Sequence, residues 1–138
     1  MSAPVIVTDT GFAADDWTGG FVPLADSAVA DARGIDLTNT DDPARLSNRL
    51  AEIAMIRITF PAFSDGRGFT LARRLRVMGY CGRLRAQGHV IADQYAMARR
   101  CGFDEVEISA DLAARQPEDQ WQFRADWRTH DYQARLRA

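Results

Sequence analysis

The clearest pattern in the chain is an alternation of apolar and polar residues over residues 55–60. Ile56 and Ile58 fall on one face of an extended segment, and Arg57 and Thr59 fall on the other. This alternation is typical of a β-strand with one buried face. Shorter apolar runs predict three more strands, over residues 34–37, 83–86 and 105–109.

Between these strands, apolar residues recur at helical spacing. Leu71, Ala72, Leu75 and Met78 predict the buried stripe of a helix that stops at Gly79. Further helices are predicted over residues 90–101, from residue 111 to residue 115, and after an N-cap at Asp42 with Leu46, Leu50 and Ile53 at helical spacing. In the helix over residues 90–101, the residues expected to point inward are Tyr95, Met97, Ala98 and Cys101.

Strand and helix alternate four times, which predicts an α/β fold with a mainly parallel sheet whose βα repeats resemble part of a (βα) barrel. At 138 residues the chain is expected to form one domain. We divide it into N-terminal strands and a loop (residues 1–33), a βα core (34–116) and a C-terminal tail (117–138). Short strands are expected at residues 4–8 and 21–24, either as a separate layer or as a hairpin that turns at Gly19-Gly20.

The predicted sheet is open, because four βα units are too few to close a barrel, which needs about eight strands. An open sheet leaves an edge that has to be covered. This predicts either a homodimer or coverage by the N-terminal strands and the tail from Trp121 to Trp127. The sequence does not choose between the two.

The composition excludes several classes of protein. All 17 basic residues are arginine, so the chain has no lysine for a pyridoxal phosphate Schiff base or a Walker-type phosphate site. The two cysteines, Cys81 and Cys101, are too few for a four-ligand zinc site, and both are expected to be buried thiols. The net charge of −2 predicts no attraction to nucleic acid or to a membrane surface. No run of 18 apolar residues is present, and we expect a cytoplasmic protein.

The candidate chemistry lies in a Gly-rich turn that precedes a helix. Gly66 and Gly68 are expected to adopt special backbone conformations that present N–H groups to a ligand, where the helix dipole favours an anion. Arg67 can add a forked contact to sulfate, phosphate or carboxylate. The alternative is that Asp65 caps the helix or holds Arg67 or Arg85.

Two further groups lie in the basic stretch that begins at this turn. Arg83 and Arg85 point to the same side of a strand and need an anionic partner, which for Arg85 is either a ligand or a carboxylate such as Asp93 or Glu107. His89 and Asp93 are four residues apart and can face each other on one helical turn. The complete candidate anion site is Ser64, Asp65, Gly66, Arg67, Gly68, Arg73, Arg85, His89, Asp93 and Gln94.

Four motifs occur in a fixed order: F-P-A-F-S-D-G-R-G-F-T-L-A-R-R-L-R at residues 60–76, G-x-L-R-A-x-G at 82–88, D-Q at 93–94 and R-x-G-F-D at 100–104. In these motifs the chain resembles the bacterial family called domain of unknown function 934, from about residue 37 to residue 108. The family residues that the resemblance carries over are Asp65, Gly66, Arg67, Gly68, Arg73, Arg85, Gly88, Asp93, Gln94, Gly102, Phe103 and Asp104.

The resemblance implies a small cytoplasmic protein encoded beside assimilatory sulfite reductase and other sulfate-assimilation genes. Members of the family are often labelled oxidoreductases, without an established reaction. We therefore expect an accessory protein of assimilatory sulfate or sulfite reduction that binds a small oxyanion or the sulfite reductase itself. The alternatives are an oxidoreductase or transferase acting on a sulfur-containing anion, and a structural partner whose arginines dock an acidic protein surface. The sequence assigns no catalytic residue, no cofactor and no set of metal ligands.

Overall fold

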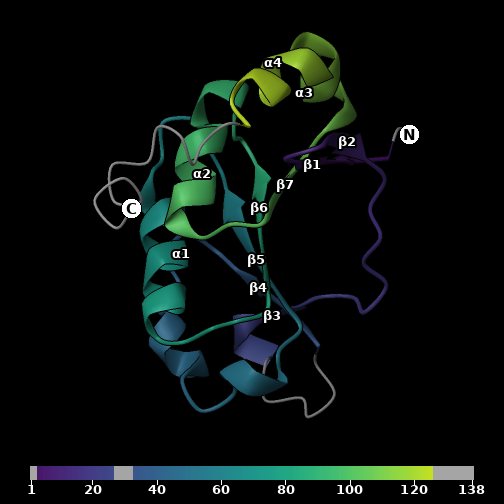
Figure 1. Cartoon of the computed structure of the whole chain (residues 1–138). Helices are drawn as coiled ribbons and strands as arrows, with labels where there is room; N and C mark the ends of the chain where they lie inside the picture. Colours follow the sequence, from purple (N-terminus) through teal and green to yellow (C-terminus); the bar gives the residue numbers. More distant parts are fainter. Residues whose placement is uncertain (1–2, 27–32, 126–138) are drawn as a thin grey trace.

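The computed structural model describes residues 3–26 and 33–125 of the chain. They form a seven-stranded sheet in the order β2-β1-β7-β6-β5-β4-β3 (Figure 1). The strands are β1 (Val5–Thr8), β2 (Gly11–Ala13), β3 (Val22–Pro23), β4 (Gly34–Leu37), β5 (Met55–Phe60), β6 (Arg83–Gly88) and β7 (Glu105–Ile108). Strands β3 to β7 are parallel, and β1 runs antiparallel to β7 and to β2. The predicted α/β fold with a mainly parallel sheet is therefore confirmed.

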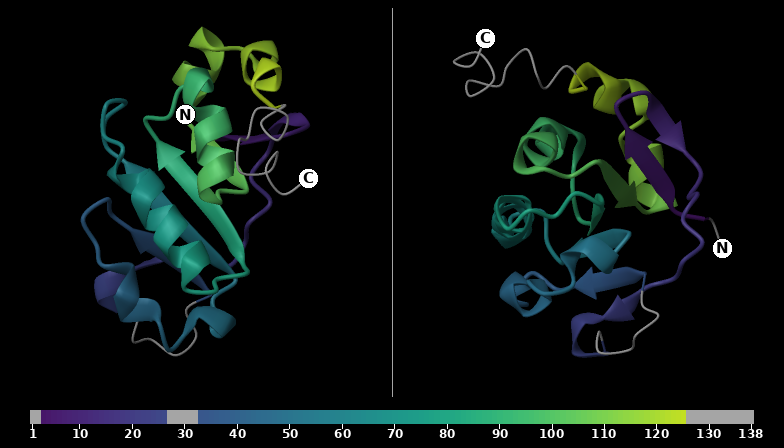
Figure 2. Two further views of the ribbon diagram at one scale, coloured as in Figure 1. Left: turned by 60° about the vertical axis from the view of Figure 1, so that its left-hand side comes forward. Right: turned by 60° about the horizontal axis from the view of Figure 1, so that its bottom comes forward.

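Strands that follow one another from β3 to β7 are also neighbours in the sheet. Right-handed crossovers that progress in one direction place their helices on the same face. Accordingly, α1 (Arg67–Val77) and α2 (Tyr95–Cys101) lie side by side on one face (Figure 2). The remaining helices, α3 (Ala110–Arg115) and α4 (Glu118–Phe123), lie near β1 and β2. The 3-10 turns of the described chain are η1 (Leu24–Asp26), η2 (Pro43–Leu46), η3 (Leu50–Glu52) and η4 (Ala92–Gln94).

The face of the sheet that the helices cover is apolar. The alternating isoleucines of β5 are fully buried there, as predicted. Phe60 at the end of β5 packs against Phe69 and Phe103, with ring centroids 4.9 and 5.8 Å apart. Gly68 makes this packing possible, because a Cβ atom at that position would lie 2.4 Å from the Cζ atom of Phe60. The apolar area buried on this face is the main driving force for folding.

The opposite face of the sheet carries charged side chains. We call it the charged face, and it consists of Asp36, Arg57, Arg83, Arg85, Glu105 and Glu107. Residues 14–21, which we call the strap, run across it from β2 at one edge of the sheet to β3 at the opposite edge (Figure 2). The ring of Phe21 in the strap lies 3.8 Å from the guanidinium carbon of Arg57, and the ring of Trp17 lies 5.6 Å from that of Arg33. The strap is thus held by cation–π contacts as well as by the ion pairs described below.

The N-terminal segment departs from the prediction. The hairpin joins β1 to β2 and turns at Asp9 and Thr10, whereas β3 lies at the far edge of the sheet beside β4. Trp17 donates from Nε1 to the carbonyl oxygen of Gly20 at 2.8 Å. The predicted hairpin at Gly19-Gly20 is therefore wrong, because this pair belongs to the strap.

One edge of the parallel strands is covered from within the chain. Strand β1 pairs with β7, which confirms coverage by the N-terminal strands. In the tail, Trp121 is 1% exposed, while Trp127 lies outside the described residues. The outer strands β2 and β3 are only three and two residues long. Short edge strands limit pairing with other chains.

Two helical predictions were too long. The helix expected after Asp42 is replaced by the turns η2 and η3, because Arg49 leaves helical geometry with a φ of −127°. Helix α2 begins at Tyr95, after the turn η4. Met97 is 50% exposed rather than inward, because the buried residues of α2 are spaced three apart and position 97 falls beside that stripe.

The two cysteines are free thiols in different environments. Cys101 is buried, as predicted, but Cys81 is exposed in the loop between α1 and β6. No helix within residues 3–26 and 33–125 combines the length and the apolar composition that a membrane crossing requires.

Candidate functional site

The predicted Gly-rich turn is built around an ion pair of its own. The carboxylate of Asp65 accepts hydrogen bonds from the backbone N–H of Arg67 at 3.1 Å and from Nη2 of the same residue at 2.7 Å. Asn39 donates a further hydrogen bond to this carboxylate. The prediction that Asp65 holds Arg67 is confirmed. Because the chain's own carboxylate lies at the start of α1, an external anion would have to displace it.

The two glycines of the turn do not need unusual conformations. Gly66 has a φ of −89°, and Gly68 lies within α1. The expected special backbone conformations are therefore wrong, and the requirement at Gly68 is space beside the ring of Phe60. Ser64 is exposed in the same turn, and the side chain of Arg67 is 62% exposed.

The ion pair in the turn gives a testable pH dependence. Arg67 lowers the pKa of Asp65 from 3.8 to about 2, because its side chain and its backbone N–H donate to the ionised carboxylate. A lowered folded-state pKa stabilises the fold above the ordinary pKa, and this contribution is lost as the pH falls from 3.8 to about 2. We expect Asp65→Asn to lower the melting temperature at neutral pH, with a difference from the unsubstituted protein that disappears across that range. Thermal unfolding followed by circular dichroism measures it, and a difference that does not change with pH would contradict the assignment.

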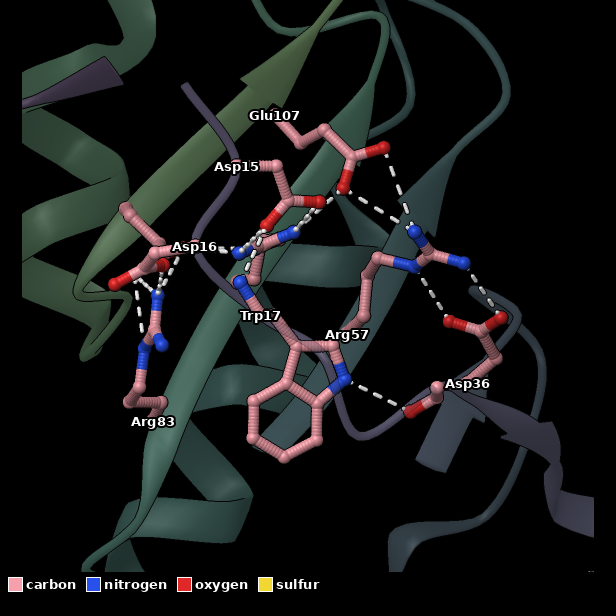
Figure 3. A network of polar contacts seen from close by, with 10 residues as sticks. Asp15, Asp16, Trp17, Asp36, Arg57, Arg83 and Glu107 are labelled. Atoms are coloured by element: carbon pink, nitrogen blue, oxygen red, sulfur yellow. Dashed lines mark hydrogen bonds and ion pairs between the residues drawn. The ribbon is translucent and has the colours of Figure 1, made fainter. Parts of the chain in front are cut away.

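Figure 3 shows a network of ion pairs on the charged face, in which Arg85 contacts three carboxylates. Its fully buried side chain reaches Asp15 of the strap at 3.0 Å, Glu105 at 2.7 Å and Glu107 at 2.8 Å. Of the two protein partners considered from the sequence, Glu107 is confirmed, whereas Asp93 pairs with another arginine. All three guanidinium nitrogens of Arg85 donate within the chain. Arg85 therefore binds protein carboxylates instead of facing a ligand.

Two more arginines extend this network across the sheet. Arg57 pairs with Asp36 at 2.6 Å and with Glu107 at 3.2 Å. Arg83 pairs with Glu105 at 2.7 Å and with Asp16 of the strap at 2.9 Å. Three arginines thus contact five carboxylates, two of which come from the strap.

The ion pair between Arg85 and Asp15 favours the charged form of both side chains. Burial alone would lower the pKa of Arg85, but hydrogen bonds and charges of its carboxylate partners raise it above its ordinary value. In turn, the guanidinium of Arg85 holds the pKa of Asp15 below its ordinary value. Because carboxylates outnumber guanidinium groups, the charged face has no positive charge left for an external anion.

Two further residues of the predicted anion site, Arg73 and Gln94, lie in different parts of the structure. Arg73 is exposed on α1 and donates to Sγ of Cys101 at 3.5 Å, on the side that faces α2. Gln94 accepts from the backbone N–H of Ile91 at 3.0 Å and donates to the carbonyl oxygen of Phe63 at 2.9 Å. Gln94 therefore ties the Gly-rich turn to η4, next to a pocket.

This pocket, with a volume of about 400 Å³, opens at the carboxyl ends of β6 and β7. It is lined by residues that follow β5 or lie at and after the ends of β6 and β7. Phe63 comes from the loop after β5, Gln87 from the end of β6, His89 from the loop after β6, and Ser109 from the residue after β7. In parallel α/β folds, ligands bind at this edge of the sheet.

The pocket contains groups that can bind an anion. Arg115 at the end of α3 is exposed, and its side chain makes no ion pair or hydrogen bond with the residues that the structure describes. Ser109 accepts from the backbone N–H of Leu112 at 3.1 Å, which leaves its hydroxyl hydrogen to donate. Nδ1 of His89 lies 3.2 Å from the carbonyl oxygen of Phe60. Because a carbonyl only accepts, Nδ1 carries the proton in the neutral ring and Nε2 is the basic nitrogen.

Glu107 also lines the pocket, and its carboxylate is bound by Arg57 and Arg85. Of the pocket's polar residues, the sequence prediction included His89 and missed Arg115, Gln87 and Ser109. The signal for Arg115 was its place as the single basic residue of the acidic segment 104–119.

A family model, described as a bacterial protein of unknown function (DUF934), matches residues 34–138. The chain belongs to this family. The matched segment contains every residue that lines the pocket except Pro4, and it leaves out Asp15 and Asp16 of the strap. No curated protein and no solved structure matched the chain. The family assignment confirms the resemblance seen in the motifs, and the family's description names no function.

Proposed function

We propose that this protein binds an oxyanion in the pocket at the carboxyl ends of β6 and β7. The observation that carries the proposal is Arg115, a guanidinium group without a partner among the described residues, which lines the pocket together with Ser109 and His89. An arginine and a hydroxyl are suitable donors to the oxygens of sulfate, sulfite or a carboxylate. The arginines of the turn and of the charged face already hold carboxylates of the chain itself.

For the biological role we propose an accessory protein of assimilatory sulfate or sulfite reduction, located in the cytoplasm, with the sulfite reductase or another sulfate-assimilation protein as its partner. The support is the gene association that the motif resemblance implies, together with the oxyanion donors of the pocket. We also propose that the sheet corresponds to part of a (βα) barrel. The support for this is the sequential order of β3 to β7 with α1 and α2 on one face.

A second candidate is an enzyme, an oxidoreductase or a transferase, that acts on a sulfur-containing anion. The observation in its favour is the tautomer of His89, which leaves Nε2 able to accept a proton beside the pocket. A reaction of this kind would depend on His89, whereas binding of the anion depends chiefly on Arg115.

Calorimetric titration with sulfite, sulfate and phosphate tests the binding proposal. We expect Arg115→Ala to weaken binding roughly tenfold or more, since a hydrogen bond to a charged group contributes about 1.5–3 kcal/mol. Arg100→Ala is the matched control, because Arg100 is also exposed and lacks a side-chain partner among the described residues, but lies on α2 outside the pocket. Equal losses in the two variants, or no binding of any of the three ions, would contradict the proposal.

A further inference from the structure

The pocket is much larger than a bare oxyanion. Its volume of about 400 Å³ lies within the range of about 300–1,000 Å³ that is usual for small-molecule sites. A water molecule takes about 30 Å³ of liquid volume, so a five-atom oxyanion would leave space for on the order of ten waters. A ligand that fills the pocket therefore carries an organic body as well as an anionic group.

The lining of the pocket combines two kinds of surface. The lining includes donor side chains that can bind an anionic group or a heteroatom, and it also includes apolar side chains. Two of the apolar residues are 6% exposed or less and belong to the core, so they form the base of the pocket. The donors are Gln87, Ser109 and Arg115, and the apolar residues are Phe63, Ile108 and Leu112.

Phe63 presents an aromatic surface that is already held in place. Its ring meets the ring of His89 edge-on, with centroids 4.9 Å apart and planes at 85°. Gln94 donates to the carbonyl oxygen of Phe63 at 2.9 Å, and the backbone N–H of Asp65 donates to the carbonyl of Ala62 at 3.1 Å. Phe63 is still 38% exposed, so a ligand can pack on it. A preorganised aromatic side chain adds affinity at a low cost in conformational entropy.

We propose that the ligand of this pocket is an organic anion with an aromatic ring, whose anionic group is bound by Arg115 and Ser109 and whose ring packs against Phe63. The inference rests on the proposed anion site and adds the chemical class of its ligand. Aromatic sulfonates, sulfate esters and carboxylates share this chemistry. A bare oxyanion uses only the donor part of the lining and binds more weakly.

Titration with sulfate, methanesulfonate and benzenesulfonate tests the two parts of the ligand separately. We expect benzenesulfonate to bind about tenfold more tightly than methanesulfonate, because its ring adds buried area and an aromatic contact. Phe63→Ala is expected to remove this difference while the affinity for methanesulfonate stays the same, and Arg115→Ala is expected to weaken both sulfonates alike. Phe123→Ala is the matched control, because Phe123 is 78% exposed on α4 and lies outside the pocket.

The outcomes separate this inference from the function on which it rests. Equal affinities for all three probes, with a loss in Arg115→Ala, would overturn the aromatic ligand and leave the anion site in place. Unchanged affinity of Phe63→Ala for benzenesulfonate would also overturn the aromatic ligand. Absence of binding for every probe would overturn the anion site and the inference together. Amide chemical shifts of Ser109 and Arg115 during the titration show whether a bound probe occupies this pocket, and circular dichroism confirms that each variant is folded.

Discussion

Replacing Arg85 with alanine is expected to lower the free energy of unfolding by about 3 kcal/mol, at the lower end of the range of about 3–5 kcal/mol for breaking a buried ion pair. The Arg85 side chain has no exposed surface, and the side chains of Glu105 and Glu107 are only 7% and 9% exposed. Without the guanidinium group these two carboxylates remain buried. The loss is limited because Glu105 keeps its pair with Arg83 and Glu107 keeps its pair with Arg57.

Urea denaturation at neutral pH measures this change. The matched control is Arg74→Ala, which breaks a pair with Asp42 whose side chains are 50% and 61% exposed, and which is expected to cost no more than about 1 kcal/mol. If Arg85→Ala cost no more than this control, the network would not stabilise the fold, and Arg85 would return as a candidate for binding a ligand.

The sheet and its main helices could be predicted because their signals are local. Burial of one face leaves a period of two in β5 and a period near 3.6 in α1, and both are visible in neighbouring residues. The strap has no such signal, because Asp15 and Arg85 are separated by 70 positions and meet only when the sheet has formed. The position of the N-terminal hairpin depends on the pairing of β1 with β7, two strands that are also far apart in the sequence.

The position of the pocket could also be predicted, but most of its residues could not. Ligands bind at the carboxyl ends of parallel strands as a general rule, and the pocket lies at those ends of β6 and β7. The Gly-rich turn wrongly indicated an anion site, because Asp65 lies close enough to Arg67 to neutralise its charge. The arginine of the turn is therefore already paired within the turn. Arg115 is visible in the sequence as an isolated base, but its lack of a partner among the described residues depends on the three-dimensional arrangement around α3.

Trp121→Ala is expected to lower the free energy of unfolding by about 3–5 kcal/mol, the usual range for removing a buried large aromatic side chain. Trp121 is 1% exposed, meets Tyr95 edge-on with ring centroids 6.2 Å apart, and donates from Nε1 to the carbonyl oxygen of Gln116 at 2.9 Å. Its helix also holds the N-terminal hairpin, since Glu118 accepts from the backbone N–H of Phe12 at 2.7 Å. Loss of this side chain therefore loosens both α4 and β2.

Phe123→Ala is the control on the same helix, because Phe123 is 78% exposed and its removal is expected to change stability by about 0.5 kcal/mol or less. Urea denaturation of the two variants measures the difference. If Trp121→Ala were as stable as Phe123→Ala, α4 would not belong to the core and would become the first candidate surface for docking the proposed reductase partner. The expected large loss instead assigns Trp121 to the fold, and the search for a partner contact then moves to the opening of the pocket around Arg115.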